Sequence, residues 1–297
     1  MRYRCRHVTR YDYGEDVPVS HHLVHLRPRP HPRQRCDAFA LTVSPAAAVS
    51  AEHDDAFGNP VSYVAVQEPH RALTVMAESV VEVFAPPGLD PSGTLPWETL
   101  RGAPGDPVTV APFAFDGMPL RAAPGLEAYA RPSFAEGRPV AVAALDLMER
   151  IHRDFTFDPT ATTVATPPGE ALANRRGVCQ DFAHVLIGGL RSMGLAARYV
   201  SGYLRTLPPP GQPRLVGADV SHAWAAVWCG GDLWLDLCPT NGRIADADYI
   251  TVAWGRDYDD VSPVRGVIHG GAGHGLSVQV DVEPLDADDQ RDPSSMR

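Results

Sequence analysis

Apolar and polar residues alternate in short runs near the start of the chain. Three such runs cover Phe39 to Val43, Val61 to Val66 and Leu73 to Val83, and proline, glycine and asparagine break the pattern between them. A period of two is typical of strands with one buried face, and short strands separated by turn residues are typical of sandwiches. We therefore predict an all-β, sandwich-like N-terminal domain over residues 1–85. Residues 86–137 are rich in proline and glycine, which indicates a connection.

Further along the chain the apolar residues follow a helical period. Residues 138–152 have this spacing, and Pro139 suits the first position of a helix. A second helix is predicted from Cys179 to Met193, and Gly194 directly after it is a natural left-handed stop. The apolar residues of this second helix recur three and four positions apart: Phe182, Val185, Leu186, Leu190 and Met193.

Alternating runs return after the second helix and indicate a second sheet. Four strands are expected there, of which the second and third form a hairpin: residues 196–204, 221–228, 232–238 and 276–282. Together with the helices they define an α+β domain over residues 138–283, which includes the C-terminal strand. Residues 284–297 are acidic and contain proline, so we expect a disordered tail there.

The turn of the expected hairpin lies at Cys229-Gly230-Gly231 and allows two registers. A three-residue turn with a left-handed glycine pairs His222 with Cys238. A register shifted by two residues, with the turn beginning at Trp228, places Asp236 opposite His222 instead. The sequence leaves both registers open.

Cys179 and His222 are the candidate nucleophile and base. At the N-terminus of a helix, the dipole and the free N–H groups favour the thiolate, so we expect the pKa of Cys179 to be lowered. The same N–H groups can stabilise an oxyanion. His222 begins a predicted strand, which fits the papain-type order of a nucleophile on a helix, a base on a strand and an orienting group on the next strand.

Four sequence blocks resemble the transglutaminase-like family of bacterial proteins. Two further segments, Leu26-Arg27-Pro28-Arg29 and Phe57-Gly58-Asn59-Pro60, resemble the β-rich domain that precedes the core in this family. The resemblance implies a papain-like transglutaminase core, in which a helix packs on an antiparallel sheet. The four blocks are Gly177-Val178-Cys179-Gln180-Asp181-Phe182-Ala183-His184, Arg198-Tyr199-Val200-Ser201-Gly202-Tyr203, Ser221-His222-Ala223-Trp224 and Pro239-Thr240-Asn241-Gly242.

The resemblance also implies a catalytic triad with Cys179 as the nucleophile and His222 as the base. Members of the family usually carry an aspartate directly before the Pro-Thr-Asn block, and this chain has Cys238 at that position. Asp236 is the nearest carboxylate, two residues back on the same face of the predicted strand. The candidate catalytic residues are therefore Cys179, His222 and Asp236, and a poorly oriented base predicts reduced activity.

Such a site would transfer an acyl group from a peptide or isopeptide amide through a Cys179 thioester. Water as the acceptor gives a peptidase or amidase, whereas an amine gives a crosslinking transglutaminase, and the resemblance favours hydrolysis. The alternative is a catalytically weakened or inactive binding or scaffold protein, because the usual triad aspartate is missing. The expected partner is a peptide or protein amide substrate.

Composition and motifs argue against several other classes of protein. A net charge of −10 disfavours nucleic acid and anionic membranes as partners. Five widely spread cysteines are typical of a reducing compartment, and a run of about 18 apolar residues is missing, so we expect a cytoplasmic protein. The cysteines form no CxxC pair and the chain has no GxxxxGK loop, so we expect no metal and no cofactor.

Overall fold

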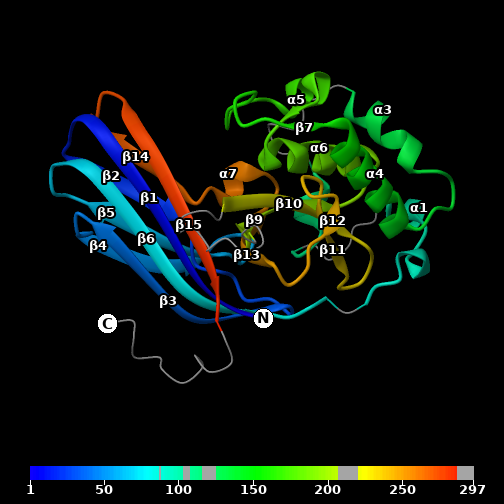
Figure 1. The fold of residues 1–297 in the computed structure, drawn as a ribbon, viewed down its shortest axis with the longest axis horizontal. Helices are drawn as coiled ribbons and strands as arrows, with labels where there is room; N and C mark the ends of the chain where they lie inside the picture. The colour runs from blue at the N-terminus through cyan, green and yellow to red at the C-terminus, as the bar shows by residue number, and fades with distance from the viewer. Residues whose placement is uncertain (87, 103–107, 116–124, 207–219, 286–297) are drawn as a thin grey trace, which may run out of the picture.

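A computed structural model describes the chain except residues 87, 103–107, 116–124, 207–219 and 286–297. Most of the predicted tail over 284–297 therefore lies outside the described residues. Figure 1 shows two parts side by side: a layered β structure that contains the N-terminus, and a second part in which helices cover a sheet.

The first part is a sandwich of two antiparallel sheets, each with four strands, which confirms the predicted all-β N-terminal domain. Alternate side chains of both sheets point inward and form a core around Val24, Leu26, Val64, Leu73 and Val75. One sheet has the order β15 (His274–Pro284), β1 (Arg2–Val17), β6 (His70–Val83) and β3 (Gln34–Ser44). The other has the order β14 (Val264–His269), β2 (Val19–Val24), β5 (Pro60–Val66) and β4 (Val49–Asp54).

The C-terminal strand belongs to this sandwich. We expected it over residues 276–282 as part of the second domain, but β15 pairs with β1 from Tyr3↔Pro284 to Tyr13↔His274. Strand β14 likewise pairs with β2 in the other sheet. Both β1 and β2 would otherwise be sheet edges with unpaired N–H and C=O groups, and the returning chain satisfies these groups. The residues between β6 and β14 are thus inserted between strands of one sandwich.

The inserted part contains the second antiparallel sheet and the helices that cover it, as the α+β prediction requires. Helix α6 (Cys179–Ser192) lies against β10 and β9, and α3, α4 and α5 pack around it. Every residue from Gln180 to Arg191 is buried, as expected of a helix that is apolar on most sides. The sheet has the order β12 (Arg243–Ile244), β11 (Trp234–Cys238), β10 (Val220–Trp228), β9 (Ala197–Leu204) and β13 (Tyr249–Gly255).

The predicted helix over residues 138–152 is α4 (Val140–Asp154). The expected connection over 86–137 is more structured than its proline and glycine content suggested, and apolar side chains at Trp97, Leu100 and Phe113 join the core. Among the described residues, no helix is both long and apolar enough to cross a membrane. The short elements are η1 (Pro91–Gly93), α1 (Trp97–Leu100), η2 (Ala111–Ala114), α3 (Leu126–Ala130), η3 (Arg131–Ser133), β7 (Thr156–Phe157), α5 (Pro168–Asn174), β8 (Arg176–Gly177) and α7 (Tyr258–Val261).

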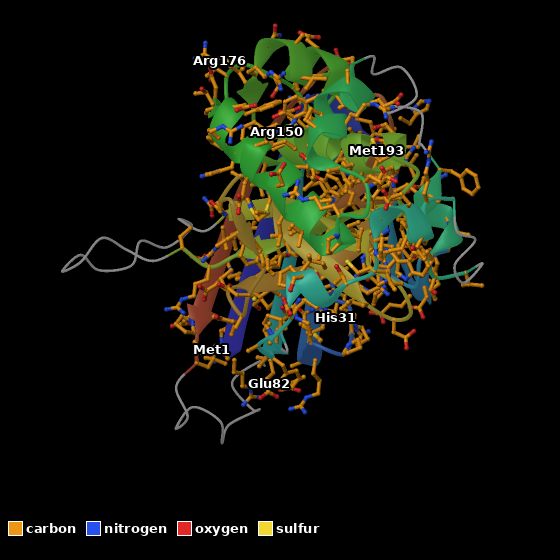
Figure 2. The ribbon with its side chains drawn as sticks, turned by 90° about the vertical axis from the view of Figure 1, so that its right-hand side faces the viewer. Met1, His31, Glu82, Arg150, Arg176 and Met193 are labelled. Carbon is orange, nitrogen blue, oxygen red and sulfur yellow. The ribbon has the colours of Figure 1, made fainter. Side chains whose placement is uncertain are left out.

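Two amide side chains of the sandwich hold its junction with strand β13. Gln34 donates to the carbonyl oxygen of Thr251 at 2.7 Å and accepts from the Thr251 N–H at 2.8 Å. Asn59 makes the same pair of bonds with Trp254, at 2.8 and 2.9 Å. Each side chain thus takes the place of a strand neighbour along β13. In Figure 2, which faces the helical part, His31 lies below Arg150, Arg176 and Met193 and above Met1 and Glu82.

We expect Asn59→Ala to lower the free energy of unfolding by about 2–4 kcal/mol, because it leaves both backbone groups of Trp254 without a partner in a buried position. Asn59 is 0% exposed and also binds Asp55. Urea unfolding followed by circular dichroism measures the change, with Asn174→Ala at an exposed site as the control. Equal loss in the two variants would contradict this role of Asn59.

Candidate active site

The N-terminus of α6 positions the thiol of Cys179. Asp181 in the first turn accepts a hydrogen bond from the N–H of Val178 at 2.8 Å and from the hydroxyl of Thr162 at 2.7 Å. A Cβ at Gly177 would lie 2.5 Å from a carboxylate oxygen of Asp181, so glycine is required for this close entry to the helix. The predicted nucleophile therefore begins a helix whose first turn is fixed from both sides.

The surroundings of the Cys179 thiol do not lower its pKa, contrary to the expectation from the sequence. The N–H groups of Gln180 and Ala223 donate toward the half-buried sulfur of Cys179 and lower its pKa, but burial is the larger effect and raises the pKa to about 11. The expected lowering by the helix terminus is therefore wrong in sign. The free-energy cost of removing the thiolate from water is larger than the stabilisation that the local N–H groups and the helix dipole provide.

His222 lies on β10, directly before Ala223, whose N–H donates toward the Cys179 sulfur. Its ring is buried beside the rings of Trp224 and Tyr249, with centroids 6.2 and 5.9 Å away. Burial, with a smaller effect of the Arg243 charge, lowers the pKa of His222 to about 4. Near neutral pH the two resting side chains are thus a neutral thiol and a neutral imidazole.

The hairpin adopts neither of the two expected registers. Trp228 pairs with Trp234, so Asp236 faces Ala226 and not His222. The N–H of Cys229 closes a wider loop on the carbonyl of Leu233 at 2.9 Å. Two successive glycines in this loop have left-handed backbone angles, with φ of 101° at Gly230 and 55° at Gly231, which gives the chain two more residues before pairing resumes.

Cys238 is the residue that contacts the base. Its sulfur lies 3.1 Å from Nε2 of His222, although the two residues are diagonal neighbours on their strands. The side-chain amide of Asn241 donates to the same sulfur at 3.4 Å. The hydroxyl of Tyr249 and the N–H groups of Thr240 and Asn241 also donate to it and lower the pKa of Cys238, but burial outweighs them and raises this pKa.

Asp236, the third candidate, has other partners. It accepts from the indole N–H of Trp224 at 3.1 Å and from Arg33 at 3.4 Å. The structure therefore brings His222 and Cys238 into contact, and Cys179 is close enough to Cys238 for their charges to interact. Among the described residues, Trp224 is what connects Asp236 to this group. Sequence reasoning missed Tyr249 and Asn241 as partners of Cys238. Asn241 lies in the Pro-Thr-Asn block, whereas no local signal marked Tyr249.

Two segments of the chain match models of known protein families. Residues 3–82 match the bacterial transglutaminase-like N-terminal region, and residues 127–239 match the transglutaminase-like superfamily. The uncharacterized protein Rv2569c of Mycobacterium tuberculosis is 46% identical, over 97% of this chain and 94% of its own length. The uncharacterized protein ML0607 of Mycobacterium leprae is 35% identical, over 96% and 99%. The chain belongs to the bacterial transglutaminase-like proteins.

Two other relatives are less similar. A protein-glutamine gamma-glutamyltransferase of Pseudomonas aeruginosa is 33% identical over 36% of this chain and 16% of its own length. The crystal structure of a provisionally assigned cysteine protease from Cytophaga hutchinsonii covers 96% of this chain and 92% of its own, with a TM-score of 0.71 and 19% identity. This last similarity supports the fold, which is a transglutaminase-like core of helices on an antiparallel sheet, preceded by a β-rich region.

We expect iodoacetamide to alkylate Cys179 in the native protein at a rate that keeps rising between pH 9 and 11, because the pKa of this thiol is raised from 9.0 to about 11. Peptide mass spectrometry can follow this one cysteine among the five. The same residue in urea-unfolded protein is the control, and its rate should be half-maximal near pH 9, well below the midpoint of the native protein. A native rate that is already maximal near neutral pH would contradict the neutral pair.

Proposed function

We propose that the chain catalyses thiol-dependent acyl transfer on a peptide or isopeptide amide, with hydrolysis favoured over crosslinking. The observation that carries this proposal is the position of the Cys179 sulfur, which receives the N–H groups of Gln180 and of Ala223, the residue directly after His222. Membership of the transglutaminase-like superfamily supports the same chemistry. The substrate class is proposed from the site, because peptide and isopeptide amides are the carbonyl compounds that such a thiol attacks.

The proposed reaction begins with proton transfer from Cys179 to His222. Because Nε2 of His222 faces Cys238, Nδ1 is the nitrogen left to accept this proton. The thiolate attacks the amide carbon, and the N–H groups at the start of α6 stabilise the negative charge that develops on oxygen. His222 then protonates the leaving amine, and a Cys179 thioester remains. Water, activated by the neutral imidazole, releases the acid and restores the thiol.

Cys238 takes the place of the orienting carboxylate in this scheme. For Nδ1 to act as a base, the proton of the neutral ring must be on Nε2 and must point to the Cys238 sulfur. Four other donors already surround this sulfur, which favours its use as an acceptor. A proton on the sulfur, however, could itself donate to Nε2, and that arrangement would leave Nδ1 protonated and inactive as a base.

This competition supports the second candidate, a catalytically weakened member of the family that acts as a binding or scaffold protein. The specific observation is that burial raises the pKa of Cys238, so the sulfur keeps its proton at neutral pH. A thiol orients an imidazole poorly, since it is a weak donor and a weak acceptor. The proposed function and this alternative therefore differ in rate and not in the identity of the reactive thiol.

We expect Cys179→Ala to abolish the release of peptides from casein, and His222→Ala to reduce it by about 10²- to 10⁴-fold, the range for loss of a general base. Incorporation of dansylcadaverine into casein measures crosslinking in the same samples and should stay below hydrolysis. Cys229→Ala, at another cysteine that is 4% exposed, is the matched control and should retain activity. Full activity in the Cys179 variant would sink the proposal.

We expect Cys238→Asp to raise kcat/KM by at least about tenfold, because a carboxylate fixes the productive tautomer of His222, and loss of such a group costs about 10⁴-fold in a serine triad. The surrounding donors suit a carboxylate as well as a sulfur. Cys238→Asn has nearly the same size without the charge, and it should give no such gain. Equal rates for the two variants would show that orientation of the base does not limit the reaction.

A further inference from the structure

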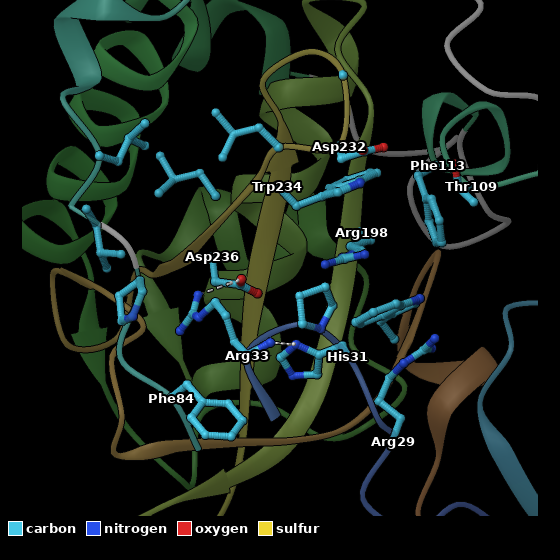
Figure 3. A pocket seen from close by; sticks show the side chains of 18 of the residues that line it. Arg29, His31, Arg33, Phe84, Thr109, Phe113, Arg198, Asp232, Trp234 and Asp236 are labelled. Atoms are coloured by element: carbon cyan, nitrogen blue, oxygen red, sulfur yellow. Dashed lines mark hydrogen bonds and ion pairs between the residues drawn. The ribbon is translucent and has the colours of Figure 1, made fainter. Parts of the chain in front are cut away.

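A large cavity lies where the sandwich meets the second sheet. Its volume is about 1020 Å³, which is at the upper end of the usual range for small-molecule sites, roughly 300–1,000 Å³. One wall comes from the sandwich side, with Arg29, His31 and Arg33, and the other from β9, β11 and β13. Figure 3 shows Arg33, Arg198, Trp234 and Asp236 around this space. Cys179 and His222 are not among its lining residues.

Arg198 is the central feature of the cavity. It is 8% exposed, and its guanidinium lies over two indole rings, 3.7 Å from the centroid of Trp254 and 4.4 Å from that of Trp234. Its Nε is buried without an acceptor among the described residues. The rings cover the faces of the guanidinium, so its N–H groups can be satisfied only in the plane.

The other unsatisfied groups of the cavity are donors as well. Nε of Arg29 and Nε of Arg33 are buried without a partner among the described residues, although the Nη groups of both arginines make hydrogen bonds. Nδ1 of His31 accepts the N–H of Arg33 at 3.3 Å, so the proton of this neutral ring is on Nε2, which is also buried without a partner. Buried arginine and histidine donors without acceptors indicate that the site is missing a group rich in acceptors. An anion is such a group.

The charge balance leads to the same requirement. Burial lowers the pKa of Arg29 to about 9 and that of Arg198 to about 10. Neighbouring arginines add to the effect, while Asp54 and Asp55 oppose it at Arg29 and Asp236 opposes it at Arg198. Asp236 already accepts from Arg33 and Trp224. Of the two other carboxylates in the lining, Asp246 pairs with Arg243 and Asp232 is exposed. A buried cation at Arg198 is thus left with incomplete compensation.

The remaining walls are apolar. They include Phe57, Phe84, Phe113, Leu233 and Ile244. An inorganic anion would leave these surfaces in contact with water, whereas an organic molecule would cover them. The in-plane approach to Arg198 suits a planar, two-oxygen group. We propose that the cavity binds a small organic carboxylate with an aromatic or aliphatic body, whose carboxylate pairs with Arg198 and whose body fills the apolar part.

The test compares 4-phenylbutyrate with its uncharged amide and with inorganic phosphate. Trp234 and Trp254 line the cavity, so emission excited at the red edge of indole absorption reports occupancy, and calorimetry gives the affinity. For a carboxylate of this size, we expect saturable binding with a Kd of about 2 mM or tighter. The amide should bind at least tenfold more weakly, and phosphate should also bind more weakly than the carboxylate.

Variants locate the binding in the cavity. Arg198→Gln should weaken 4-phenylbutyrate at least tenfold, whereas Arg153→Gln, on the exposed surface of α4, should have no effect. If Arg198→Gln does not fold, Phe84→Asp serves instead, because Phe84 lines the cavity but is 41% exposed. Its new carboxylate should weaken the anion by a similar factor. No saturable binding, equal binding of acid and amide, tighter binding of phosphate, or unchanged affinity in the cavity variants would each overturn the proposal.

Discussion

The burial of helix α6 on all sides is the constraint on which the rest of the second domain depends. A helix that is buried from Gln180 to Arg191 needs partners all around it, and the sheet together with α3, α4 and α5 provides them. Close approach is part of this packing, since a Cβ at Gly189 would lie 3.1 Å from Leu147 and 3.3 Å from Ala130. The first turn of such a helix has little freedom to move, which is why it can hold a reactive thiol against a strand with fixed geometry.

Local pattern was enough to predict the parts of the site that lie within one element. The helix that begins at Cys179 and the strand that carries His222 follow from periodicity, and the sandwich follows from alternation. The partner of His222 could not be predicted in the same way. Register depends on the backbone angles of Gly230 and Gly231, and two glycines in a turn are compatible with several loops.

Ionisation and long-range pairing were also beyond the sequence. The helix-terminus argument for Cys179 considers only neighbours along the chain, whereas the burial that raises its pKa comes from the complete fold. Tyr249 contacts Cys238 although it lies on the edge strand β13, whereas Cys238 lies on β11, with β10 and β9 between the two strands. The last strand had a clear alternating pattern, but alternation does not say which edge a strand will join.

Asp236 links the two regions of chemical interest. Its carboxylate accepts from Arg33, which lines the cavity, and from Trp224, whose ring lies against His222. A carboxylate that the sequence suggested as a third catalytic group is instead shared between a cluster of cations and the support of the base. The cavity and the thiol site are thus on a common framework, although they are lined by different residues.

The return of the chain to the sandwich has a consequence for folding during synthesis. Strands β14 and β15 complete both sheets, and they leave the ribosome only after the entire insertion. Until then β1 and β2 have open edges, which are sites where nascent chains aggregate or pair wrongly. Joining Tyr3 to Pro284 closes a loop of nearly the whole chain, and contacts of this sequence separation form slowly. The sandwich, whose first strands precede the insertion, is completed only after the insertion has been made.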